Sequence, residues 1–509
     1  LDTQTLHAIA EKNQLSVQTL CLTAFAETVA TWSSSSQFRL NLPFFVRAPY
    51  QQEIDAVVGD FANLSLLSVE LNAQDVFYQA AQRIEQQVSQ VQAHAAYAGI
   101  HVLRDLSKHR QQLETSPIVF TSALEIGEIF SQDVQLNLGR PVWCISQGPK
   151  VDLDVQIAYM NGGLVVNWDI RRHAFKPHVI QHMFEHYIAQ ITAMLQDETY
   201  LHSPMTYQLP ADQQVRRQAQ PAALAANVSR QLAVHCDEYR VVNAMGLDCP
   251  DWVIGTLWGR VRTEDVEQHN ALNLKMIQGQ SWYATGYAAY YNDAAEIVVF
   301  EDRQQLLKMH GYWLDLNEIR QKILDIPQLA DAKVYAVDHD GKTRFIAYLV
   351  LSAHAELTQQ QLHAAYAARL PHYLIPEHSY VVAAEQFAQL NAENIQEFIK
   401  NNQSLAQHSS AQTQTALEQV VYFMMAKIIG LPPDEHNTNI DFFDYGGDSL
   451  LATHFVAALH RYFKDCGITV VDIFTQRTVK NIAQIIEQNL PQSAHKIAEI
   501  FLKVLEGKK

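Results

Sequence analysis

The chain has 509 residues, 48% of them hydrophobic and 18% charged, and a formal net charge of −17. A chain of this length is too long to fold around one ordinary hydrophobic core, and it predicts three or four domains of about 100–200 residues each. The acidic charge argues against a nucleic-acid partner, and no apolar run is long enough to cross a membrane. The start of the sequence also lacks the pattern of a signal peptide.

The cysteines and histidines indicate neither a metal site nor a disulfide framework. The five cysteines are scattered without a CxxC pair, and the 22 histidines show no ligand spacing such as HExxH. Unpaired cysteines are typical of a reducing compartment, so we expect a cytoplasmic protein.

Two polar stretches are expected to be linkers and to divide the chain. Residues 201–229 are rich in Gln, Ala and Pro, and residues 401–414 show no apolar periodicity. They leave one domain over 1–200, a second over 230–400 and a third over 415–490, followed by a tail helix over 491–509.

The first domain alternates helical and extended patterns, which predicts an α/β fold. The segment "SVQTLCLTAFAETVATWS" places Leu20, Ala24 and Val29 on one helical stripe. "FRLNLPFFV" and "SPIVFTSAL" are β-rich runs that end in turn residues. "KPHVIQHMFEHYIAQITAML" repeats apolar residues every four positions and predicts an amphipathic helix.

Five segments of this domain, in chain order, resemble the C-terminal lobe of heterocyclization domains, which are relatives of condensation domains. The segments are "LCLTAFAETVATWS", "FRLNLPFFVR", "VGDFANLSLL", "SPIVFTSAL" and "ISQGPKVDLDVQIAYMNGGLVVNWD". The pattern SQ-x-P-x-V-x-L-D-x-Q separates this family from ordinary condensation domains. The resemblance implies that an amide is made and that Ser, Thr or Cys is then closed into an oxazoline or thiazoline.

Ring closure requires proton transfer, which a carboxylate with a hydroxyl partner can perform. A side-chain oxygen or sulfur attacks the new amide carbonyl and water then leaves, so a group must accept and return protons. The resemblance implies that Asp154 is this carboxylate and Thr121 its hydroxyl partner, both catalytic. Asp152, on the same strand face two residues earlier, is the rival. Without the resemblance, a strand-edge Asp and a β-favouring Thr would be the simpler interpretation.

The domain differs from the family at three positions and lacks one of the family's two lobes. Ala62 and Asn63 stand where the family usually has Thr and Ser, and Gly148 stands where Thr is usual. The family's N-terminal lobe, with its paired-aspartate motif, is absent from this sequence. Either that lobe was removed, or it lies on a separate chain, which would then be a partner. The alternative to a catalytic domain is a non-catalytic carrier scaffold whose lobe only docks partners.

Residues 230–400 are expected to form an α+β domain that resembles the last part of an adenylation domain. The resemblance rests on "GLDCPDWVIGTLW", "WYATGYAAYYNDAAEIVVFEDRQQLLKMHGYWLDLNEI" and "LPHYLIPEHSYVV". No phosphate loop is present, Tyr287 replaces the family's ribose-binding Asp, and Asn394 replaces its lysine; Lys308 matches a family lysine. An amide cannot supply a lysine's charge. We expect an inactive remnant and an adenylating enzyme that acts in trans.

The segment "DFFDYGGDSLLATHFVAALHRYF" is the most specific motif in the chain. Gly446 and Gly447 permit a sharp turn, Asp448 is a good N-cap, and Ser449 then begins a helix. The free N–H groups of a helix N-terminus suit an attached phosphate. The helix carries one apolar stripe: Leu451, Phe455, Leu459 and Phe463.

This motif resembles that of the peptidyl carrier proteins of nonribosomal peptide synthetases. The resemblance implies an all-α four-helix domain in which 4′-phosphopantetheine is attached to Ser449, beside Asp448, by a phosphopantetheinyl transferase. The whole chain is thus expected to be a multidomain synthetase module that receives an acyl group from an upstream aryl or peptidyl carrier protein. Oxazoline and thiazoline rings suggest siderophore biosynthesis.

Overall fold

A computed structural model gives the fold of the chain in two compact units, residues 1–103 with 114–382 and residues 104–113 with 383–509. The structure describes residues 3–506 except for a number of gaps. These gaps are 46–52, 60, 111–113, 147, 149–150, 172–173, 198, 206, 220–223, 225–235, 262–273, 278–279, 301–305, 310–311, 340–341, 354, 356, 359–360, 363–364, 367, 371–373, 377, 391–394, 396–414, 430–441 and 443–448.

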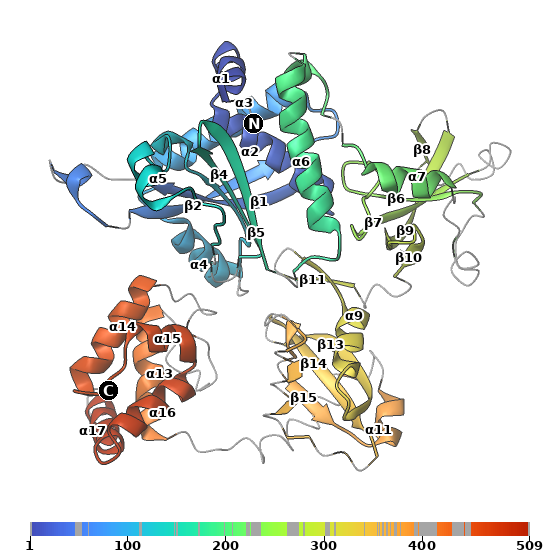
Figure 1. Ribbon diagram of the computed structural model, residues 1–509. Coiled ribbons are helices and arrows are strands. Elements are labelled where there is room, and N and C mark those ends of the chain that lie inside the picture. The colour runs from blue at the N-terminus through green and yellow to red at the C-terminus, as the bar shows by residue number, and fades with distance from the viewer. Residues whose placement is uncertain are drawn as a thin grey trace. The chain divides into compact units, whose positions relative to one another are not determined.

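The first part of unit one is built on a five-stranded sheet in the order β2-β1-β3-β4-β5 (Figure 1). β1 and β2 are antiparallel, β3 is parallel to both β1 and β4, and β5 returns antiparallel to β4. The strands are β1 (Gln37–Phe45), β2 (Ala62–Glu70), β3 (Ile118–Ser122), β4 (Leu153–Met160) and β5 (Gly163–Ile170). The sheet and its helices confirm the predicted α/β pattern.

Helices α2 (Val17–Thr31) and α6 (Val179–Gln196) pack together over one face of this sheet. α2 is apolar on nearly every side, which is typical of a buried helix, and Ser16 caps it by accepting a hydrogen bond from the Thr19 N–H. The Phe25 ring contacts those of Phe120, Trp168 and Tyr187. The other helices of this part are α1 (Thr3–Lys12), α3 (Phe77–Ala93), α4 (Gly99–Arg110) and α5 (Gln132–Leu138).

Three further sheets follow between residues 239 and 381. The first contains β6 (Tyr239–Val242), β7 (Gly255–Arg260), β8 (Leu274–Ile277), β9 (Gln280–Tyr291) and β10 (Ile297–Val299). β11 (Leu306–Met309) pairs with β12 (Tyr312–Asp315), and β13 (Leu329–His339), β14 (Lys342–Leu351) and β15 (His378–Val381) form the third sheet, against which α9 (Leu316–Leu324) packs.

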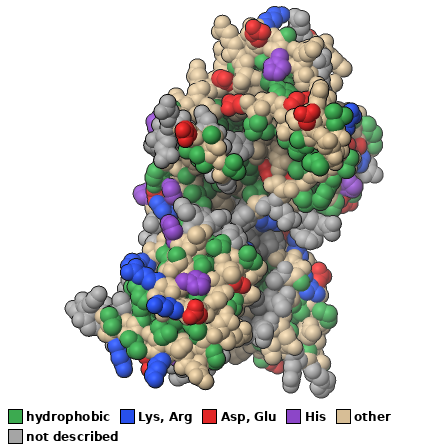
Figure 2. All heavy atoms as spheres, turned by 60° about the vertical axis from the view of Figure 1, so that its left-hand side comes forward, with side chains coloured by type: hydrophobic (Ala, Val, Ile, Leu, Met, Phe, Trp, Pro, Cys, Tyr) green, Lys and Arg blue, Asp and Glu red, His purple; other side chains and the backbone are tan. Residues whose placement is uncertain are grey.

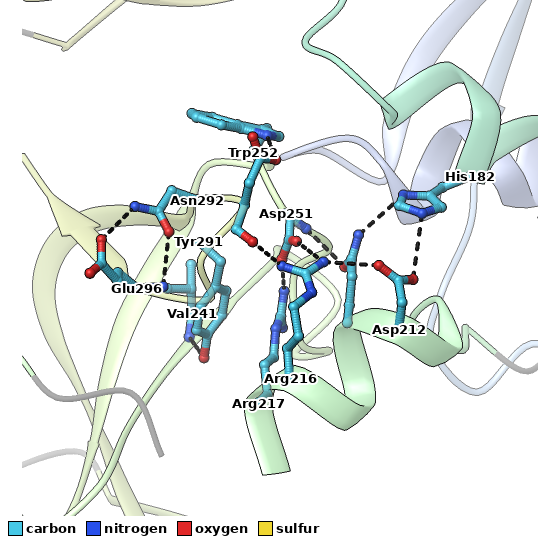
Figure 3. A network of polar contacts seen from close by, with 12 residues as sticks. His182, Asp212, Arg216, Arg217, Val241, Asp251, Trp252, Tyr291, Asn292 and Glu296 are labelled. Atoms are coloured by element: carbon cyan, nitrogen blue, oxygen red, sulfur yellow. Dashed lines mark hydrogen bonds and ion pairs between the residues drawn. The ribbon is translucent and has the colours of Figure 1, made fainter. Parts of the chain in front are cut away.

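The stretch expected to be a linker contains a helix with buried contacts, α7 (Ala211–Ala219). Arg216 and Arg217 both bind the carboxylate of Asp251, at 2.9 and 2.7 Å, and Asp251 is only 4% exposed (Figure 3). At the start of the helix, Asp212 lies 3.4 Å from His182 on α6. A polar helix with a weak apolar stripe is thus held by charged partners rather than by its own periodicity.

Unit two contains the carrier-like region, whose described regular elements are helices. The helices of unit two are α11 (Ala384–Gln389), which precedes this region, and α13 (Ala416–Ile429), α14 (Ser449–Tyr462), α15 (Val470–Gln476), α16 (Val479–Asn489) and α17 (Ala494–Glu506). Thr469 and Asp472 form a capping box at the start of α15. α13 packs against α14, α16 and α17, and Ala494 and Ala498 of α17 belong to the same buried core.

On the face shown in Figure 2, hydrophobic side chains lie in several groups among polar and charged ones. Among the helices that the structure describes, none has the length and hydropathy needed to cross a membrane.

Candidate functional site

Thr121 and Asp154 lie on neighbouring strands of the first sheet, and the structure brings their side chains together. β3 and β4 pair in a register that sets Val119 opposite Asp154 and Thr121 opposite Gln156. The Thr121 hydroxyl donates a hydrogen bond of 3.3 Å to Oδ1 of Asp154. Asp154 is 9% exposed, so its carboxylate is largely shielded from water. A hydroxyl and a carboxylate in contact are the pair that proton transfer requires.

This pair lies on the face of the sheet that α2 and α6 do not cover. Leu153, Val155 and Ile157 of β4 are fully buried in the core beneath those helices. Side chains alternate along a strand, so Asp154 must point to the opposite face.

Asp152, the rival carboxylate, has a different partner. Its Oδ1 lies 3.0 Å from Nη1 of Arg171, in an ion pair beyond the end of β5. The carboxylate that faces the Thr121 hydroxyl is therefore that of Asp154. The catalytic role itself stays a prediction.

Three residues that the sequence reasoning did not single out lie on the same face. β4 and β5 pair so that Asp154 is opposite Asp169 and Gln156 is opposite Asn167. The Gln156 side-chain amide donates to Oδ2 of Asp154 at 3.0 Å and to Oδ2 of Asp169 at 3.4 Å. Asn167 donates to the Gln156 carbonyl at 3.3 Å and to Asp169 at 3.2 Å. Gln156 is the last residue of the pattern SQ-x-P-x-V-x-L-D-x-Q, and the alternation of polar residues in "VVNWD" was the available signal for Asn167 and Asp169. Only the strand register shows which residues they face.

A small cavity borders the same strands. It has a volume of about 230 Å³, and residues of β1, of β3 and of the turn after β3 line it, among them Pro43, Phe120, Ser122 and Glu125. Gln18 of α2 also lines the cavity, which therefore lies on the face of the sheet that the helices cover. Phe120 and Ser122 alternate with Thr121 along β3, so the Thr121 hydroxyl points to the opposite face and the cavity is not part of the Thr121–Asp154 site.

Ser449 is the first residue of α14, as the motif predicts. Ala452, Phe455, Leu459 and Phe463 are fully buried and fix this helix in the core, and the Phe442 ring stacks on Phe455 at 5.5 Å. Asp448, Gly446 and Gly447 lie outside the described residues. A phosphodiester at Ser449 fits this position, because the first N–H groups of a helix have no partner within it.

The positions compared with adenylation domains are described only in part. Tyr287 lies on β9, and its backbone N–H donates to the Thr285 hydroxyl at 3.3 Å. Lys308 lies on β11, paired with Trp313. Asn394 lies outside the described residues. Among the residues that are described, no group of three or more His, Cys, Asp or Glu side chains could hold a metal ion.

Two family models match the chain. The condensation domain model matches residues 2–215, and the model of the phosphopantetheine attachment site matches residues 419–486. Residues 2–215 are thus a condensation domain and residues 419–486 a carrier domain, the two kinds of domain that the sequence resemblance to nonribosomal peptide synthetases implies. Its carrier domain indicates a 4′-phosphopantetheine prosthetic group, the cofactor that the Ser449 motif predicts.

The curated relatives are large synthetases, of which the chain matches a small part. It is 41% identical over 222 residues to phenyloxazoline synthase MbtB of Mycolicibacterium paratuberculosis, which is 43% of this chain and 19% of that protein. It is 34% identical over 200 residues to pyochelin synthetase PchF of Pseudomonas aeruginosa, which is 38% of this chain and 11% of that protein. The chain thus spans less than a fifth of these relatives.

A solved structure supports the fold of the chain. A four-domain nonribosomal peptide synthetase in its holo form, bound to AMP and glycine, matches with a TM-score of 0.55. The match covers 96% of this chain and 61% of that one at 11% sequence identity.

Proposed function

We propose that residues 1–200 take part in condensation and in cyclodehydration of Ser, Thr or Cys to an oxazoline or thiazoline. The observation that carries this proposal is the hydrogen bond of 3.3 Å between Thr121 and the largely buried carboxylate of Asp154. The similarity of the chain to a phenyloxazoline synthase and to pyochelin synthetase supports a ring-forming reaction. By the same analogy, the product is a siderophore.

The site residues suggest how the protons move. The side-chain oxygen or sulfur of the substrate attacks the amide carbonyl carbon, and Asp154 accepts the proton that this group loses. Asp154 returns this proton to the former carbonyl oxygen, which becomes the hydroxyl of the adduct. The amide nitrogen then loses its proton to Asp154 as the C=N bond of the ring forms. Asp154 passes this second proton to the hydroxyl, whose C–O bond breaks as water leaves. Thr121 holds the Asp154 carboxylate in place and supplies a hydroxyl that can pass the proton on.

The carrier domain, over about 415–490, is proposed to hold the substrate of this reaction. Ser449 at the N-terminus of α14 carries the prosthetic group, and Asp448 precedes it. The thiol of bound phosphopantetheine supplies the thioester linkage for an aminoacyl or peptidyl group. We further propose that residues 230–400 are an inactive adenylation remnant, so that an adenylating enzyme in trans loads the carrier.

The test of this proposal is intact mass spectrometry of the holo chain. The chain is combined with the N-terminal lobe of a condensation domain, a loaded upstream carrier protein and candidate adenylating enzymes. We expect a product on Ser449 that is lighter by one water than the open amide, and no product on the Ser449→Ala variant. A carrier that is loaded with amide but never loses water would favour the non-catalytic scaffold instead.

A further inference from the structure

The polar side chains beside Asp154 form more hydrogen bonds than the contact between Thr121 and Asp154 requires. Asp169 accepts three N–H groups at one oxygen, Oδ2: the backbone N–H of Ser146 at 2.6 Å, the amide of Asn167 at 3.2 Å and that of Gln156 at 3.4 Å. Three donors from three places in the chain converge on this carboxylate. They hold it as a fixed acceptor.

An ionised carboxylate only accepts hydrogen bonds, and this fact sets the direction of the two amides next to it. Asn167 must turn its NH₂ group toward Asp169, and the same group then faces Gln156. Gln156 must therefore present its carbonyl oxygen to Asn167, as the distance of 3.3 Å shows. Its own NH₂ group is left pointing at the carboxylates of Asp154 and Asp169.

The orientation of the Gln156 amide in turn fixes the orientation of the Asp154 carboxylate. Its Oδ2 is occupied by the Gln156 amide at 3.0 Å, while its Oδ1 faces the Thr121 hydroxyl at 3.3 Å. A carboxylate held at one oxygen cannot rotate freely about its terminal bond, so the other oxygen stays aimed at Thr121. A reacting group displaced by about 1 Å can lose about a hundredfold in rate.

We propose that Gln156, oriented by Asn167 and Asp169, is a positioning residue that holds the Asp154 carboxylate in its reactive direction for ring closure. This inference rests on the proposed function. It goes beyond the Thr121–Asp154 pair by assigning a role to residues of β4 and β5 that do not transfer a proton themselves. The alternative is that these polar side chains only form hydrogen bonds with one another on a half-buried sheet face and do not affect ring closure.

The test compares two products on the same protein: the open amide and the ring. Gln156→Met keeps the length of the side chain but removes its amide, and Asp169→Asn keeps the shape but gives position 169 a donor, so that the neighbouring amides can reverse. Gln181→Met, on the exposed side of α6, makes the same chemical change away from the site. Each variant is assayed as the holo chain with the N-terminal lobe supplied, beside Asp154→Asn.

We expect Gln156→Met and Asp169→Asn to make the amide at the rate of the unchanged chain while the ring-to-amide ratio falls about tenfold to a hundredfold. Gln181→Met should leave the ratio unchanged. A ratio unchanged in both site variants, or an equal fall in amide and ring, would overturn the positioning role. If Gln156→Met does not fold, the ring-to-amide ratio of Asp169→Asn decides the test. Should Asp154→Asn still form the ring at full rate, the proposed function fails, and the positioning role fails with it.

Discussion

At the scale of single residues, the hydroxyl of Thr121 is the simplest group to test. Thr121→Ala removes the donor to Asp154, whereas Thr121→Ser keeps it and removes only a methyl group. We expect the alanine variant to lose ring formation by about a hundredfold to ten-thousandfold, the range of general acid–base assistance, and to keep amide formation. The serine variant should retain most of the activity. Product ratios by mass spectrometry measure both, and equal losses in the two variants would contradict a role for the hydroxyl.

A second residue-scale feature is the buried acid of α2. Glu27 is 2% exposed, and His186 approaches its carboxylate at 2.7 Å while Gln190 also donates to it. Burial raises the pKa of Glu27 above its ordinary value of 4.5, against the opposing effects of His186 and Gln190. The folded chain therefore binds this proton more tightly than the unfolded chain does, so stability falls as the pH rises from about 4.5 through the folded pKa.

We predict that Glu27→Gln removes this part of the pH dependence, because a neutral amide has no proton to lose. Hydrogen exchange of the α2 amides, measured at pH 5 and pH 7, gives the local free energy of opening. That free energy should fall between the two pH values by more in the unchanged chain than in the variant. The control Glu185→Gln, on the exposed side of α6, should behave like the unchanged chain. An identical pH dependence with and without the Glu27 carboxyl would contradict the prediction.

The sequence predicted the Thr121–Asp154 pair but not the residues around it. The pair was reached through the family resemblance, and its rival Asp152 could not be set aside without knowing that Arg171 lies beside it. Gln156, Asn167 and Asp169 meet through the antiparallel register of β4 and β5. Strand register is a long-range property, so local residue patterns do not show which side chains face each other.

At the scale of elements, the long helices and the strands of the first domain followed from hydrophobic periodicity, whereas α7 did not. Its sequence, ADQQVRRQA, is mostly polar and was interpreted as part of a linker. Its position depends on Asp251, more than thirty residues further along the chain, and on Tyr291, whose ring lies 3.7 Å from the Arg217 guanidinium. Tertiary partners of this kind override local propensity.

We therefore predict that Arg217→Met destabilises the sheet around Asp251. The buried carboxylate keeps Arg216 as a partner but loses one charged hydrogen bond, which should cost about 1–3 kcal/mol. Hydrogen exchange of β6 and β7 measures the loss. Arg260→Met removes a partly exposed pair with Glu238 and should change the same amides by about 0–1 kcal/mol. Equal effects of the two substitutions would show that α7 is an ordinary linker.

At the scale of the whole molecule, the family models match residues 2–215 and 419–486, and the region between them contains three separate sheets. Sequence and structure agree that the condensation and carrier parts have cores of their own, one around α2 and one around α13. We therefore assign ring formation to the condensation part and the attachment of the substrate to the carrier part.

The assignment of ring closure to Asp154 is tested most directly by the mass of the product on Ser449 in Asp154→Asn and in Asp152→Asn, each with the N-terminal lobe and the loaded partners supplied. We predict that Asp154→Asn accumulates the open amide, heavier than the ring by one water, at an undiminished rate of amide formation. Asp152→Asn, which alters the pair with Arg171, should still release water and form the ring. Ring formation at full rate by Asp154→Asn would contradict the central claim, and its loss in Asp152→Asn alone would move the catalytic role to the other carboxylate.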